Sequence, residues 1–95
     1  MEQKILDNEL NVKVVLPISE ENKGFMMTIA NTFVMHGGTL RMYTKNEDEE
    51  SLFVNTNEIA YHLLKVYMQD YFSLLEIDNT EEGFKILVLQ STGLN

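Results

Sequence analysis

The side chains best suited to chemistry in this sequence are carboxylates, and four stand in succession: Glu47, Asp48, Glu49 and Glu50. Paired carboxylates can serve as a general acid and a general base, provided that burial or crowding raises one pKa. This run lies between two short apolar segments, so we predict an exposed turn. It also lacks the alternating acids and the sixth-position glycine of a calcium-binding loop. The run is therefore interpreted as a charged surface.

The other residues that could do chemistry are isolated. The two histidines, His36 and His62, lack partners, since Glu58 and His62 alone do not make a zinc site. The chain has no cysteine, which excludes a thiolate metal site and a cysteine nucleophile. Gly37 and Gly38 follow a predicted helix, whereas a phosphate-binding loop precedes one. We therefore predict no catalytic residue, no metal and no cofactor, and a protein that is not an enzyme.

The elements that must position the acidic run follow from hydrophobic periodicity, which predicts two helices and five strands. Ser19 is the predicted N-cap of the first helix, with Glu20 and Glu21 in its first turn, where the helix dipole favours anions. Asn55 and Glu58 resemble a capping box at the start of the second helix. The predicted strands are 10–18, 39–45, 51–55, 72–78 and 84–90, and the second helix is 56–71.

The resulting order is β-α-β-β-α-β-β, which divides into two β-α-β units. Right-handed crossovers then predict an α+β fold with a ferredoxin-like, split β-α-β antiparallel sheet. Both helices would cover one face of this sheet, and one extra C-terminal strand would be added. Residues 1–95 are predicted to form a single domain, with residues 1–9 as either a short helix or an extended arm. Because such folds host enzymes, regulatory domains and binding modules, topology alone does not indicate the activity.

Charge restricts the class of partner. The chain has 15 acids against 7 bases and a formal net charge of −8, which predicts repulsion from nucleic acid and from anionic lipid. No apolar run approaches the roughly 20 residues of a membrane span, and the acidic N-terminus does not read as a signal peptide. We therefore predict a cytoplasmic protein that binds neither nucleic acid nor membrane directly, and whose partner is basic.

The predicted helices carry more apolar surface than one sheet face requires. No charged residue lies between positions 25 and 38, although a helix on a sheet normally keeps a charged outer stripe. One explanation is that the helices pack against each other as well as against the sheet. The alternative is a subunit interface, where methionine and tyrosine are enriched and charge is depleted. On that reading we expect a homodimer whose interface contains Met27, Met35, Tyr61 and Tyr67.

The predicted topology brings the acidic run to the same end of the molecule as two other acidic segments. Seven of the 15 acids gather there: Glu20, Glu21, Glu47, Asp48, Glu49, Glu50 and Asp70. These charges could serve solubility alone. Their convergence favours a second hypothesis, in which they bind and mask a basic, nucleic-acid-binding surface of a partner protein. In composition, such a chain resembles the small acidic DNA mimics that phages and mobile elements direct against host proteins.

Two alternatives remain open. The chain could be a dimeric regulatory or ligand-binding module of the same fold, which requires a concave pocket near Met27, Tyr43 or Tyr61. It could also be a subunit of an enzyme whose chemistry resides on another chain.

Overall fold

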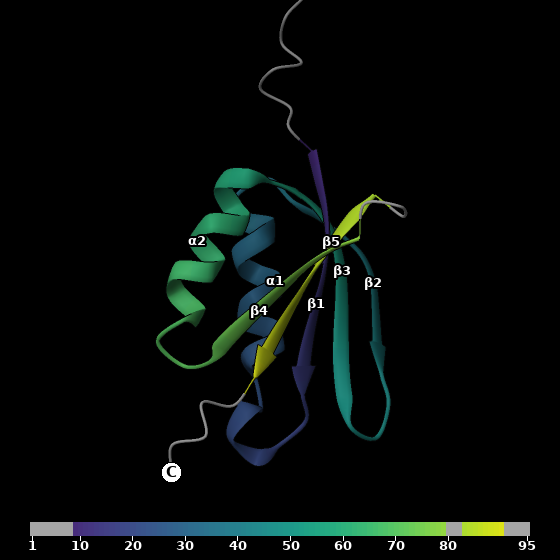
Figure 1. Cartoon of the computed structure of the whole chain (residues 1–95), viewed down its shortest axis with the longest axis vertical. Coiled ribbons are helices and arrows are strands. Elements are labelled where there is room, and N and C mark those ends of the chain that lie inside the picture. Colours follow the sequence, from purple (N-terminus) through teal and green to yellow (C-terminus); the bar gives the residue numbers. More distant parts are fainter. Residues whose placement is uncertain (1–8, 80–82, 91–95) are drawn as a thin grey trace, which may run out of the picture.

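The computed structural model describes residues 9–79 and 83–90 as a small single-domain α+β fold with a five-stranded sheet and two α-helices (Figure 1). The elements are β1 (Glu9–Pro17), the 3₁₀ helix η2 (Glu20–Asn22), α1 (Phe25–Met35), β2 (Thr39–Lys45), β3 (Glu49–Asn57), α2 (Glu58–Met68), β4 (Ser73–Asn79) and β5 (Phe84–Gln90). Residues 1–8, for which a short helix or an arm is predicted, lie outside the described residues, and Glu9 begins β1.

The sheet is mixed, and its strand order is β2-β3-β1-β5-β4. Neighbouring strands pair in an antiparallel manner except β1 and β5, which are parallel. The prediction of an antiparallel, ferredoxin-like sheet is therefore corrected. Instead of lying beside β1, β4 forms the edge, and the final strand β5 returns to occupy the place next to β1 (Figure 1).

The side chains of the last two strands explain this exchange. In β5, Leu87 and Leu89 are fully buried beneath the helices. The corresponding face of β4 carries Glu76 and Asp78, whose register partners are Leu87 and Lys85. Burying two carboxylates in the middle of a sheet costs free energy, whereas at the edge they remain partly in water. The more apolar strand therefore takes the central place.

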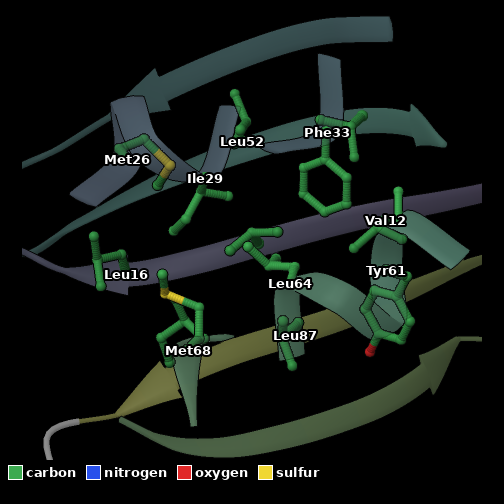
Figure 2. Packing of buried hydrophobic residues seen from close by; sticks show 14 of the residues in the cluster. Val12, Leu16, Met26, Ile29, Phe33, Leu52, Tyr61, Leu64, Met68 and Leu87 are labelled. Carbon is green, nitrogen blue, oxygen red and sulfur yellow. The ribbon is translucent and has the colours of Figure 1, made fainter. Parts of the chain in front are cut away.

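The core lies between the two helices and one face of the sheet, as predicted (Figure 2). Residues at alternate positions of β1, β3 and β5 face it, because successive side chains of a strand point to opposite faces. From the helices, Ile29, Phe33, Leu64 and Met68 are fully buried. Tyr61 also lies within this cluster, among aliphatic side chains.

The first helix begins later than the sequence predicts. Ser19 makes no side-chain capping bond, and residues Glu20–Asn22 form the separate short helix η2. Gly24, with a φ of 88°, turns the chain before α1 begins at Phe25. That positive φ suits glycine and ends the regular helical path that would join η2 to α1. The predicted Ser19 cap is thus wrong for α1, while Glu20 and Glu21 keep a place in η2.

The second helix begins later than predicted because β3 is longer, and it ends at Met68, before the predicted position 71. β3 continues to Asn57, and the Asn57 side chain accepts a hydrogen bond from the Ala60 backbone N–H at 2.8 Å. Asn57 is therefore the N-cap, in place of Asn55. The start of β3 is also extended, so that Glu49 and Glu50 belong to the strand and not to the turn.

Candidate functional site

The acid-bearing segments that the sequence analysis singles out lie at one end of the molecule, drawn at the bottom of Figure 1. The turn between β2 and β3, the helix η2 and the segment after α2 all lie there. Two of these segments are joined directly. Pro17 is the register partner of Glu49, and the Ile18 backbone N–H donates to the Asp48 carbonyl at 2.9 Å. We call the seven predicted residues the acidic end: Glu20, Glu21, Glu47, Asp48, Glu49, Glu50 and Asp70.

The turn of the acidic end has a fixed backbone. The Asn46 side-chain oxygen accepts hydrogen bonds from the backbone N–H groups of Asp48 and Glu49, both at 2.9 Å. The Asn46 N–H in turn donates to the Glu49 carbonyl at 3.0 Å. An asparagine side chain that bonds to the backbone two residues later stabilises such a turn. The side chains of residues 47 and 48 are therefore attached to a turn whose backbone is held by hydrogen bonds.

Most carboxylates of the acidic end face water. Glu20, Glu47, Asp48 and Asp70 are exposed, and Glu49 and Glu50 are half-buried. Among the described residues, the ion pair at this end joins Lys23 to Glu20 at 3.7 Å, with side chains 75% and 89% exposed. Exposed pairs of this kind contribute about 0–1 kcal/mol. Lys45, the register partner of Glu50, also lies at this end, so two described lysines accompany the carboxylates and the region keeps a net negative charge.

Glu50 has an additional role within the acidic end. Its Oε1 atom accepts a hydrogen bond from the Tyr43 hydroxyl at 2.8 Å. This bond, together with slight desolvation and the Glu50 charge, raises the pKa of Tyr43 above its ordinary value. Glu50 thereby connects the acidic end to the neighbouring surface of β2.

A second group of acids is arranged in the opposite way, and we call it the Tyr61–Glu76 cluster: Tyr61, Lys65, Glu76, Asp78 and Lys85. Glu76 accepts from the Lys65 ammonium at 2.8 Å and from the Tyr61 hydroxyl at 3.0 Å. Lys85 lies 3.8 Å from Glu76 and 3.3 Å from Asp78. Both ammonium groups also lie over the Tyr61 ring, at 4.8 and 5.3 Å from its centroid.

The pKa values of the cluster follow from these contacts. The hydrogen bond from Lys65 lowers the pKa of Glu76, with support from Tyr61 and Lys85 and against a smaller opposing effect of burial. Burial raises the pKa of Tyr61, as does its hydrogen bond to Glu76. Tyr61 therefore stays protonated as a donor, and Glu76 stays ionised as an acceptor.

Of the four residues predicted for a dimer interface, three are exposed and one is buried. Met27 and Met35 on α1 are 68% and 77% exposed, and Tyr67 on α2 is 44% exposed. Tyr67 packs edge-on against Tyr71, with ring centroids 5.6 Å apart. Tyr61 is buried in the core and is removed from the set, because its ring has no free surface to offer.

A groove between α1 and β2 lies where the ligand-binding alternative requires one. We call it the α1–β2 groove; its volume is about 380 Å³, and Met27, Ala30, Leu40 and Tyr43 are among its lining residues. Glu50, bonded to Tyr43, lines it as well. Of the three positions expected near a pocket, Met27 and Tyr43 line this groove and Tyr61 does not.

The sheet face opposite the helices carries apolar side chains that the sequence analysis overlooks. They are Val15, Met42, Phe53, Leu75, Ile77, Phe84, Ile86 and Val88, at alternate positions of the five strands. A shallow hollow of about 590 Å³ lies on this face, lined in part by Arg41, Phe53 and Phe84. A sequence signal exists, since residues 86–89 of β5 form a continuous apolar run of the kind found in strands that are buried on both faces.

Within the described ranges, no three His, Cys, Asp or Glu side chains are grouped so that they could hold a metal ion. His36 and His62 are exposed. Among the same residues, no helix has the length and apolar character required to cross a membrane.

Comparisons with known proteins identify no relative: no family model, no curated protein and no solved structure matches this chain.

Proposed function

We propose that this protein binds a basic surface of a partner protein through its acidic end. The observation that carries this proposal is the convergence of separate segments, joined by the Ile18–Asp48 hydrogen bond, into one region of exposed carboxylates. Like charges gathered within one region repel each other and so reduce the stability of the fold. The same charges create a strong negative electrostatic field, and such a field attracts cationic surfaces.

The rigidity of the turn supports a role in recognition. Solubility requires exposed charge, but it does not require a particular backbone geometry. Here the Asn46 side chain accepts hydrogen bonds from the backbone N–H groups of Asp48 and Glu49. A surface that is already ordered loses less conformational entropy when a partner binds. The exposed carboxylates of Glu47 and Asp48 are therefore the residues we expect to contribute most.

The favoured partner is a nucleic-acid-binding protein. Duplex DNA presents about one negative charge per 1.7 Å of its axis, and surfaces that bind it carry clustered lysine and arginine. Carboxylates gathered on one end of a protein can occupy such a surface and so exclude DNA or RNA. Association would be fast, and affinity would fall as the salt concentration rises.

The test compares the wild-type protein with the variant E47Q/D48N/E49Q/E50Q, which removes four charges at nearly constant volume. Each protein is immobilised and used to capture proteins from a lysate of its native cell, and the column is then washed with increasing salt. We expect basic proteins that the wild type retains, that duplex DNA displaces, and that the variant does not retain. Retention of the same proteins by both columns would show that the acids of the turn are exposed to solvent and do not bind these proteins.

A matched pair of variants separates position from charge. E47Q/D48N removes two exposed acids from the turn, and E9Q/E58Q removes two exposed acids elsewhere. The formal net charge changes from −8 to −6 in both. We expect the first pair to weaken binding of a captured protein at least about tenfold more than the second, which corresponds to about 1.4 kcal/mol. Equal losses would indicate a general charge effect.

The α1–β2 groove supports a second candidate function, the binding of a small ligand. Its walls are mostly apolar, and the Glu50 carboxylate with the Tyr43 hydroxyl supplies one polar site. Ligand pockets typically combine apolar walls with a few polar groups that set orientation. An apolar amine fits this arrangement best. In a thermal-shift screen of metabolites, a true ligand would raise the unfolding temperature with increasing concentration, and Met27→Lys, which places a cation in the groove, would abolish that shift.

A further inference from the structure

The sheet face that the helices leave uncovered, which we call the open sheet face, carries the eight apolar side chains named above. Met42, Leu75 and Ile77 are 52%, 44% and 44% exposed, respectively. Phe53, Phe84, Ile86 and Val88 are half-buried between them, and Val15 lies at the centre, 8% exposed. The apolar side chains are concentrated on β4 and β5, and polar side chains of β1 and β3, among them Lys13 and Ser51, separate this part from Met42 and Phe53.

A sheet with two apolar faces normally lies between two layers, because each apolar face must be removed from water. The strand β5 meets this description. Leu87 and Leu89 face the helices, while Ile86 and Val88 point to the other side. Within the described residues, both α-helices lie on the same side of the sheet, and no element covers the open sheet face (Figure 1).

The charges on this face determine which partner can approach. Its acids, Glu9 and Glu49, lie at the ends of β1 and β3. Between them lie the cations Lys13 and Arg41; the Lys13 ammonium is 5.4 Å from the centroid of the Phe53 ring. A chain with a net charge of −8 repels another copy of itself over most of its surface. On the open sheet face two cations offset the two acids, so this face adds little to that repulsion.

The size of the face is adequate for a dimer. Five strands of seven or more residues make a surface about 24 Å by 23 Å, from the usual strand spacing and rise. Two copies packed face to face would therefore bury about 1,100 Å² in total, above the roughly 1,000 Å² expected of a biological interface.

From these observations we propose that the open sheet face is the contact between two copies of this chain. The two sheets pack face to face in a two-fold symmetric homodimer, with the helices on the outside. The interface is thus formed by the strands and not by the helix residues Met27, Met35 and Tyr67 that the sequence suggests. The proposal does not depend on the function of the acidic end. If both hold, the dimer presents two acidic ends and can bind a repeated basic target with increased avidity.

The first experiment measures the oligomeric state with a matched pair of variants. L75K/I77K introduces two lysines on the open sheet face, and M27K/M35K introduces two lysines on the outer surface of α1. Both lower the net negative charge from −8 to −6, so neither adds to the general repulsion between copies. Circular dichroism and thermal unfolding establish that each variant is folded. Sedimentation velocity over about 1–500 μM, a range around a micromolar affinity, then gives the mass.

We expect the wild type and M27K/M35K to be dimers at the upper concentrations. We expect L75K/I77K to be a monomer, with its dissociation constant raised at least about 100-fold, because two charged groups would have to be desolvated in the interface. A monomeric wild type at 500 μM would overturn the proposal. So would dissociation of M27K/M35K while L75K/I77K stays dimeric, since that result would place the interface on the helices.

A second experiment uses the wild-type protein alone and remains informative if L75K/I77K does not fold. Met42 lies on the open sheet face, while Met27 and Met35 lie on α1, and all three are exposed in the single chain. Oxidation by dilute peroxide is followed at each methionine by mass spectrometry, at low and at high protein concentration. We expect Met42 to be oxidised several-fold more slowly at high concentration and the two α1 methionines to be unaffected. Protection of Met27 or Met35 without protection of Met42 would contradict the proposed interface.

Discussion

The acidic end and the Tyr61–Glu76 cluster contain the same type of charged group and differ in what surrounds it. In the cluster, Glu76 lies within 4 Å of two lysines and accepts a hydrogen bond from a buried tyrosine. At the acidic end, the described ion pair joins Lys23 and Glu20 on almost fully exposed side chains. The number of acids in a region therefore does not indicate their role. The distance from each carboxylate to the nearest cation does.

This difference has an energetic consequence. A carboxylate that is paired and hydrogen-bonded in the folded state stabilises that state, and its removal leaves its partners unsatisfied. Carboxylates that are crowded together without cations destabilise the folded state through repulsion. Removing acids from the two regions should therefore change stability in opposite directions.

The largest effect is expected for Glu76→Ala. The Tyr61 hydroxyl would lose its acceptor, and Lys65 and Lys85 would lose the carboxylate they share. Because the Glu76 side chain is 37% exposed, solvent screening limits the loss in the free energy of unfolding to about 1–2 kcal/mol. Urea unfolding at pH 7 measures it. Glu47→Ala, in the turn, serves as the control and should change stability by less than about 0.5 kcal/mol; equal losses would remove the distinction between the two regions.

The second prediction concerns the pH dependence of the cluster. Since the folded state lowers the pKa of Glu76 below its ordinary value of 4.5, its charge stabilises the protein above that pH. The stabilisation is lost as the pH falls through the lower pKa of the folded state. Glu76→Gln keeps an acceptor for Tyr61 but removes the charge. The wild type should therefore be more stable than E76Q at pH 7, and the difference should shrink towards zero in urea titrations at progressively lower pH below 4.5. A difference that persists at pH 2 would show that the charge is not its cause.

The third prediction applies to the acidic end. E47Q/D48N should raise the free energy of unfolding by a few tenths of a kcal/mol at low ionic strength, because it relieves repulsion between exposed carboxylates. The gain should disappear near 1 M salt, where the screening length is about 3 Å. Unfolding curves at two salt concentrations test this. A loss of stability at low salt would mean that these side chains are needed by the fold.

The smallest effect is expected at Tyr43, where the acidic end meets β2. The Glu50 carboxylate raises the pKa of Tyr43 through a hydrogen bond and through its charge. Glu50→Gln should therefore shift the Tyr43 pKa downward, towards the ordinary tyrosine value. An NMR titration of the tyrosine ring carbons follows this, and Tyr61, which is bonded to Glu76 instead, is the internal control. An unchanged Tyr43 pKa would show that the contact with Glu50 is not kept in solution.

Much of the fold can be predicted from local sequence. The bounds of β2 and β5 match the alternating patterns at 39–45 and 84–90, and both helices cover one face of the sheet. The placement of three acidic segments at one end follows from chain direction alone, and so does not depend on the order of the strands. Their role in binding stays a prediction.

The incorrect predictions concern features that depend on contacts between segments far apart in the sequence. Strand order is decided by competition between β4 and β5 for the place beside β1, and the acids Glu76 and Asp78 make β4 the weaker candidate. Tyrosine is a residue type enriched in interfaces, but the hydrogen-bond partner of Tyr61 is Glu76, which lies 15 residues later in β4. The open sheet face becomes visible only when residues of five strands are brought onto one surface.

The parallel pairing of β1 and β5 has a consequence for how the protein folds. Val12 and Lys85 are register partners although 73 positions separate them. Forming the middle of the sheet therefore requires closure of a very long loop, and such pairings slow folding. Until β5 arrives, one side of β1 presents unpaired N–H and C=O groups, which can pair with another chain. We expect the nascent chain to be most prone to aggregation in this interval, before its last strand enters the sheet.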